Sequence, residues 1–115
     1  MSSTSVTPDL QSAAEIIDLA SRAVGKGLRQ LVAIGGADKH QVLAYDLAHA
    51  ASAVETARSL LDYGAKGDHE GLITCAFTAD MAHELMTKLI GREALWGLDV
   101  NPLAAASSFL SLIHI

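Results

Sequence analysis

Apolar residues recur at three- and four-residue steps along most of the chain, in three segments separated by glycine-containing stretches. This spacing is typical of amphipathic α-helices, because residues three and four positions apart share one helix face. No segment shows the strict alternation of a half-buried strand. The pattern predicts an all-α fold: an antiparallel helical bundle of three long helices followed by a C-terminal helical segment.

The first predicted helix begins near Thr7, which can cap it, with Pro8 in its first position. It ends at the glycine pair 35–36. Gly25 and Gly27 weaken the helix, so residues 28–32 either continue it with a kink or form a separate turn. The expected buried stripe consists of Leu10, Ala13, Ile16, Ile17, Ala20 and Val24.

The second predicted helix covers about residues 39–63. Asp38 and Gln41 have the spacing of a capping box at its start. Gly64 follows the helix at the position where a left-handed residue commonly ends it. The expected stripe consists of Leu47, Ala50, Ala51, Val54, Ala57, Arg58 and Leu61, with Arg58 at its edge.

The third predicted helix runs from Asp68, its expected cap, to about Leu89, and Gly91 stops it. Its short connection to the second helix makes the two antiparallel neighbours. We expect it to be covered on more than one side, and Trp96 to anchor the chain beyond it. One apolar side consists of Ile73, Phe77 and Met81, and the other of Leu72, Ala76, Ala79, Met86 and Ile90.

The two ends of the chain differ from the helical segments. Residues 1–6 are polar and are expected to be disordered, and residues 1–109 are expected to form one N-terminal helical domain. The final string LSLIHI resembles the translation of a sequencing-library adapter. We therefore expect residues 110–115 to be a non-native tail, and the chain to be a fragment of a longer protein.

Composition and charge exclude several classes of partner. The chain has 115 residues, 50% of them hydrophobic and 4% aromatic, and a formal net charge of -5. No basic cluster favours nucleic acid or an anionic membrane surface. The N-terminus lacks the features of a signal peptide, no uninterrupted apolar run reaches about 18 residues, and Cys75 is the single cysteine. A cytoplasmic location is expected.

One candidate for metal chemistry is a repeated carboxylate–imidazole pair. Asp46 with His49, and Asp80 with His83, place both groups on one face of their helix. Di-iron bundles use a related Glu-x-x-His pattern together with lone carboxylates. The candidates for those lone carboxylates are Glu15 and Glu55. The alternative is that these residues form a polar network beside the core, so no catalytic, cofactor-binding or metal-binding residue is assigned.

The strings AYDLAHA, LLDYGAKGD and GRE-x-x-WG, within residues 28–99, resemble the N-terminal helical extension of acyl-CoA dehydrogenase family flavoproteins. The resemblance implies a parent enzyme that uses FAD for α,β-dehydrogenation of an acyl-CoA and is reoxidised by an electron-transfer flavoprotein. In that family the catalytic base and the FAD contacts belong to later domains, and no residue of this chain matches them.

The resemblance implies that this segment packs against the missing catalytic domains of the same chain, is inert alone and binds no cofactor itself. A homo-oligomer is expected. Two alternatives from other classes remain. One is a free-standing helical protein that dimerises or binds partners through the same stripes. The other is an Asp/His metal-binding helical bundle.

Overall fold

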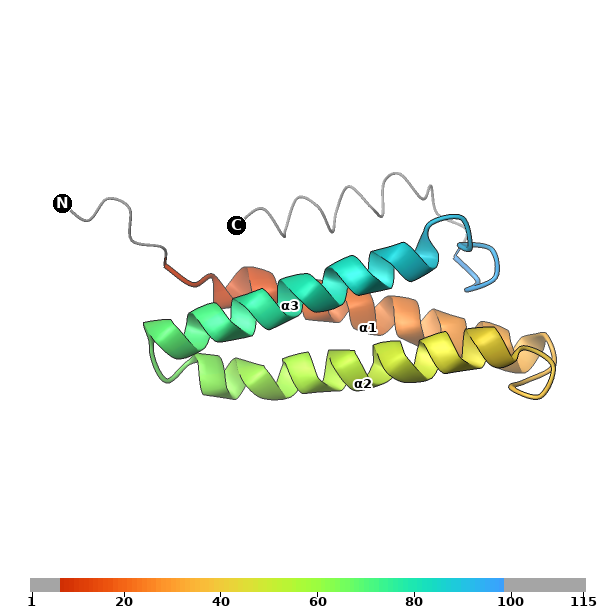
Figure 1. Cartoon of the computed structure of the whole chain (residues 1–115), viewed down its shortest axis with the longest axis horizontal. Helices are drawn as coiled ribbons and strands as arrows, with labels where there is room; N and C mark the ends of the chain where they lie inside the picture. Colours follow the sequence, from red (N-terminus) through yellow and green to blue (C-terminus); the bar gives the residue numbers. More distant parts are fainter. Residues whose placement is uncertain (1–6, 99–115) are drawn as a thin grey trace.

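The computed structural model describes residues 7–98, which form three α-helices: α1 (Leu10–Ala33), α2 (Gln41–Gly64) and α3 (Asp68–Leu89). Successive helices are antiparallel, and each helix contacts the other two (Figure 1). No strand occurs in residues 7–98. The predicted all-α antiparallel bundle is therefore confirmed. The expected disorder of residues 1–6, the C-terminal helical segment and the tail 110–115 lie outside the described residues.

A single apolar core runs along the bundle, because all three helices turn their stripes toward one another. The side chain of Trp96, which follows α3, closes this core and is 0% exposed. The other members of the core cluster are Ile16, Ile17, Ala20, Ala23, Val24, Leu31, Leu43, Leu47, Ala50, Val54, Ala57, Met81, Ala82, Leu85, Met86 and Leu89.

The start of α1 differs from the prediction. Asp9 caps the helix: its carboxylate accepts hydrogen bonds from the Ser12 backbone N–H at 3.0 Å and from the Ser12 hydroxyl at 2.8 Å. Thr7 and Pro8 precede the helix, so their predicted roles as cap and first residue were wrong. Because the Asp9 carboxylate accepts a second hydrogen bond, from the Ser12 hydroxyl, Asp9 rather than Thr7 caps the helix.

Gly25 and Gly27 do not interrupt α1, which continues to Ala33. The helix ends at Gly35 and Gly36, as predicted, and both have positive φ angles, 122° and 85°. The Gly36 N–H donates to the Leu31 carbonyl at 2.8 Å, so a free carbonyl at the helix end is satisfied.

The predicted capping box of α2 was wrong. The helix begins at Gln41 with His40 at the cap position, and no side chain caps it. Asp38 instead belongs to a preceding turn, in which the backbone N–H groups of Lys39 and His40 donate to the Gly36 carbonyl. Because this turn uses residues 36–40, α2 starts two residues later than expected.

Gly64 also has a different role from the predicted one. It is the last residue of α2, and its successor Ala65 is right-handed with φ of -72°. A Cβ atom on Gly64 would lie 2.6 Å from Thr74 Oγ1 and 3.0 Å from Leu10 Cδ2. The glycine therefore permits close approach of α1 and α3 to the end of α2.

The limits of α3 agree with the prediction, with one correction. Gly67 occupies the cap position, and Asp68 is the first helical residue, where its charge favours the positive end of the helix dipole. Gly91, with φ of 83°, follows the helix end at Leu89.

The buried face of α3 includes two polar residues that the pattern missed. Thr74 is 0% and Thr78 is 1% exposed, and each hydroxyl donates to a backbone carbonyl. Although α3 contacts both other helices, parts of its two apolar sides remain exposed: Ile73 by 41%, Leu72 by 39% and Ile90 by 62%.

Candidate functional site

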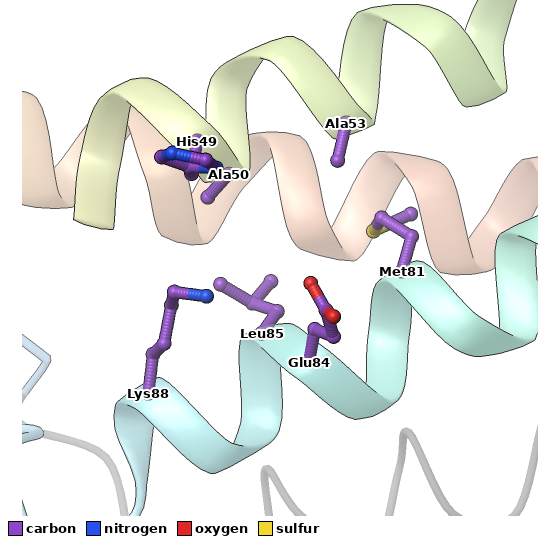
Figure 2. A pocket seen from close by; sticks show the side chains of 7 residues that line it. All are labelled: His49, Ala50, Ala53, Met81, Glu84, Leu85 and Lys88. Atoms are coloured by element: carbon purple, nitrogen blue, oxygen red, sulfur yellow. The ribbon is translucent and has the colours of Figure 1, made fainter. Parts of the chain in front are cut away.

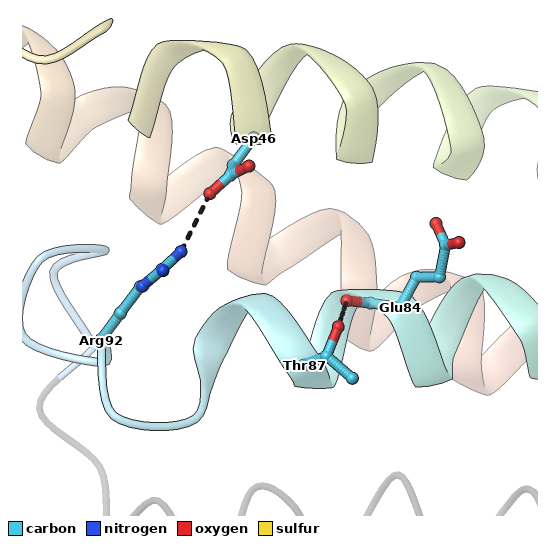
Figure 3. Close-up of polar contacts among 4 residues, drawn as sticks. All are labelled: Asp46, Glu84, Thr87 and Arg92. Atoms are coloured by element: carbon cyan, nitrogen blue, oxygen red, sulfur yellow. Dashed lines mark hydrogen bonds and ion pairs between the residues drawn. The ribbon is translucent and has the colours of Figure 1, made fainter. Parts of the chain in front are cut away.

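The two Asp/His pairs lie in different surroundings. Asp46 pairs with Arg92, with 3.3 Å between Oδ2 and Nη1 (Figure 3), and only 13% of its side chain is exposed. His49 is exposed, and its ring lies against Tyr45, with 4.4 Å between the ring centroids. Asp80 and His83 are both exposed on α3.

These pairs are not brought together as metal ligands. Among residues 7–98, no three His, Cys, Asp or Glu side chains are grouped so that they could hold a metal ion. Of the candidate lone carboxylates, Glu15 is exposed on α1, and Glu55 lies 3.6 Å from Arg58 in an exposed ion pair. The described part of the chain therefore lacks the ligand set that the Asp/His hypothesis requires.

The exit segment, residues 91–98, makes specific contacts with itself and with the helices. It begins with Gly91, whose N–H donates to the Glu93 carboxylate at 3.1 Å. Arg92 then reaches across to Asp46 on α2. The backbone N–H of Trp96 donates to the carbonyls of Arg92 and Glu93, both at 3.2 Å, so the segment forms a compact turn.

Trp96 packs between α1 and α2. A Cβ atom placed on Gly27 would lie 2.9 Å from Trp96 Cε3 and 2.5 Å from Leu47 Cδ2, so only glycine leaves room for the indole at this position. The indole Nε1 is buried and has no hydrogen-bond acceptor among the described residues. The expected anchoring by Trp96 is confirmed, and its dependence on Gly27 was missed.

A small hollow lies between α2 and α3 (Figure 2). Its volume of about 90 Å³ is well below the 300–1,000 Å³ typical of sites for cofactors and drug-sized ligands, so it cannot enclose a flavin or an acyl-CoA. Its base is apolar, and its rim carries an imidazole, a carboxylate and an ammonium group. The lining residues are His49, Ala50, Ala53, Met81, Glu84, Leu85 and Lys88.

Cys75, a residue of α3, is half-buried and contacts the residue that caps α1. Its Sγ lies 3.7 Å from the Asp9 carbonyl, to which the thiol donates. This contact agrees with a packing role for the thiol. Within residues 7–98, no helix has the length and apolar character needed to cross a bilayer.

Comparisons with known proteins give no identification: no family model, no curated protein and no solved structure matches this chain.

Proposed function

We propose that this chain is the N-terminal helical module of an FAD-dependent acyl-CoA dehydrogenase, most like (2S)-methylsuccinyl-CoA dehydrogenase. The catalytic domains of the parent chain hold FAD, remove hydrogens from the α and β carbons of an acyl-CoA and pass electrons to an electron-transfer flavoprotein. The module packs against those domains, has no catalytic residue and binds no cofactor itself. The proposal includes a cytoplasmic location for the parent enzyme.

The observation that supports this proposal is a set of exposed apolar residues at the two ends of one side of α3, between which Met86 is buried. Leu72 and Ile90 are 39% and 62% exposed, and Ala76, on the same side, is exposed. Large exposed apolar patches are typical of surfaces that pack against another protein or domain. A catalytic domain that covers this side of α3 would remove them from water.

The resemblance gains support from the contacts that its own strings make. AYDLAHA supplies Asp46 and Leu47, and GRE-x-x-WG supplies Arg92 and Trp96. Arg92 pairs with Asp46, and a Cβ on Gly27 would meet both Leu47 and Trp96. Strings far apart in the sequence are therefore parts of one structural unit, as expected if the matched motifs specify a helical module.

The direct test is binding to a catalytic body. The purified chain should carry no flavin absorbance and oxidise no acyl-CoA. It should bind a methylsuccinyl-CoA dehydrogenase from which the helical extension has been removed. Ile90→Glu should weaken this binding because it places a charge in the interface, whereas Val32→Glu, at a 77% exposed position on α1, should leave it unchanged.

Two results would overturn the proposal. The first is a yellow chain that oxidises an acyl-CoA without any added domain. The second is the absence of binding to the truncated dehydrogenase at concentrations where the chain is shown by circular dichroism to be folded.

A free-standing interaction protein is the second candidate, and a specific observation favours it. Three helices and Trp96 close one continuous core, as a domain that folds alone requires. Cooperative unfolding of the chain, together with a defined oligomer in light scattering and no affinity for the truncated dehydrogenase, would favour this candidate.

A further inference from the structure

The exit segment is joined to α3 through a glycine with room to move. The segment follows the last turn of α3 at one end of the bundle (Figure 1). Gly91 has a φ of 83°, in the region that glycine adopts without strain, and a Cβ atom at this position would meet nothing within 4 Å. The backbone torsion angles of Gly91 can therefore change without a clash with neighbouring side chains.

The backbone hydrogen bonds of the exit segment are internal. The N–H groups of Arg92, Trp96, Gly97 and Leu98 donate to carbonyls within residues 89–94. Within the part of the chain that the structure describes, no backbone hydrogen bond joins this segment to α1 or α2. The segment can therefore leave both helices without breaking a backbone hydrogen bond.

Few side chains hold the exit segment on the bundle. The Trp96 indole, which is 0% exposed, makes the largest contact, and the half-buried Leu98 packs beside it against the core. The ion pair between Arg92 and Asp46 adds little, because 51% of the arginine side chain is exposed to water. Attachment of the segment therefore depends mainly on one indole.

The seat of this indole leaves one polar group unsatisfied. Trp96 Nε1 is buried and has no acceptor among residues 7–98. Water would accept a hydrogen bond from this group whenever the indole left the core. The missing hydrogen bond offsets part of the free energy that burial of the apolar ring contributes. The closed arrangement is therefore less stable than the area of the buried ring alone would make it.

We propose that the exit segment is a lid, which opens about Gly91 while α1, α2 and α3 stay folded. The helices can remain packed in the open state because each of them contacts the other two directly. Local openings of this kind need less free energy than unfolding of the whole chain. Opening uncovers an apolar notch between α1 and α2, with Gly27 at its floor and Leu47 beside it. The lid thus controls whether this notch is filled or accessible to another apolar group.

This inference does not depend on the proposed enzyme. It concerns the closure of the bundle, and it applies equally to an enzyme module and to a free-standing protein. Its test is hydrogen exchange in the chain alone, whereas the test of the proposed function is binding to a catalytic body.

The decisive measurement is hydrogen exchange of the indole by nuclear magnetic resonance. Trp96 is the single tryptophan, so its Nε1–H gives one isolated signal, which exchanges with deuterium only when the indole leaves the core. The backbone N–H groups of Ala57 in α2 and Ala82 in α3, both 0% exposed, report on unfolding of the helices. The indole should be at least tenfold less protected than these two groups. Its exchange rate should also depend less on urea, because the opening exposes less surface.

Two variants separate opening of the lid from unfolding of the helices. Arg92→Ala removes the ion pair to Asp46 and should raise the exchange rate of the indole about two- to fivefold. Thr74→Val is the counterpart, because the Thr74 hydroxyl contacts the Leu60 carbonyl between α2 and α3, and this contact persists when the lid opens. It should raise the exchange rates of the helix groups about fivefold and leave that of the indole unchanged.

Three results would overturn the proposal. The first is equal protection and equal urea dependence for the indole and the two helix groups. The second is faster exchange of the indole in Thr74→Val, in step with the helix groups. The third is an unchanged indole rate in Arg92→Ala. Circular dichroism should show that both variants keep their helices.

Discussion

The two ends of the bundle achieve close packing in opposite ways. At the tryptophan end, defined by Gly27, Leu47 and Trp96, one large side chain fills the space that a glycine leaves open. At the opposite end, the threonine end, defined by Gly64, Gly71 and Thr74, neighbouring segments come close because the two glycines have no side chain to hold them apart. A Cβ on Gly71 would lie 2.7 Å from Pro8 Cγ, as close as the corresponding contacts at the other end.

The difference shows in the polar groups as well. At the threonine end, the Thr74 hydroxyl donates across the interface to the Leu60 carbonyl at 2.9 Å, so a buried polar group is satisfied between two helices. At the tryptophan end, the indole Nε1 is left without an acceptor among the described residues. We infer that the tryptophan end depends on apolar volume, and that the threonine end depends on close approach and a specific hydrogen bond.

The largest effect is expected for Trp96→Ala. Removal of a fully buried indole leaves a cavity in the core, which should lower the free energy of unfolding by about 3–5 kcal/mol. Urea unfolding followed by far-ultraviolet circular dichroism measures this change. Trp96→Phe retains part of the volume and should lose less. Equal stability of the alanine variant and the original chain would show that the exit segment does not close the core.

The next largest effect is a difference in stability between alanine substitutions at two glycines of α1. Gly27→Ala should cost about 1–3 kcal/mol through overpacking against Trp96, which outweighs the gain in helix propensity. Gly25→Ala should instead stabilise the chain by about 0.5–1 kcal/mol, because its new Cβ would meet nothing closer than Arg29 Nη1 at 3.7 Å. Thermal unfolding of both variants gives the comparison, and the same sign for both would contradict it.

A smaller effect tests the threonine end. The Thr74 hydroxyl is within hydrogen-bond distance of the Leu60 carbonyl on α2 at 2.9 Å and of the Glu70 carbonyl on its own helix at 3.0 Å. Thr74→Val keeps the shape of the side chain but removes both contacts, and should cost about 1 kcal/mol. Thr78→Val is the control, because the Thr78 hydroxyl donates at 2.8 Å to the Thr74 carbonyl of its own helix only. Its loss should be smaller in the same urea titration. A larger loss for Thr78→Val would mean that the contact between helices contributes little.

The smallest effect concerns pH at the start of α1. Hydrogen bonds from the Ser12 backbone N–H and hydroxyl lower the pKa of Asp9 from its usual 3.8. The charged cap therefore stabilises the fold above pH 3.8, and this contribution is lost as the pH falls through the lowered pKa.

Asp9→Asn retains a capping oxygen that does not titrate. The original chain should lose more stability than this variant when unfolding is compared at neutral pH and below pH 3.8. A constant difference between the two proteins at both pH values would assign the lowered pKa no role in stability.

The features that the sequence predicted correctly are local. Helical periodicity predicts the all-α fold, and the glycines at 35, 36 and 91 mark helix ends because their positive φ angles suit only glycine. The start of α1 was misplaced because Thr7 and Asp9 are both good caps, and only the contact with Ser12 distinguishes them.

The features that the sequence did not predict depend on contacts between helices. Gly27 and Gly64 were interpreted through backbone conformation, whereas the structure explains them by their neighbours, Trp96 and Thr74. Thr74 looked polar in the pattern, and its buried hydrogen bond appears only when α2 lies beside it.

The predicted partner of Asp46 was also wrong because it depends on contacts between distant segments. Asp46 was grouped with His49 by spacing along one helix, but its partner is Arg92, from a segment far along the chain. No periodicity within α2 could indicate that pairing.

The order of the core residues along the chain has a consequence for synthesis. Trp96 follows all three helices, so a ribosome releases Gly27 and Leu47 well before the indole that covers them. The nascent bundle must stay open at this end until translation has passed the exit segment, and during that interval its apolar surface is available to chaperones. Trp96 is the single tryptophan, so its fluorescence in stalled nascent chains of increasing length would report the moment of closure.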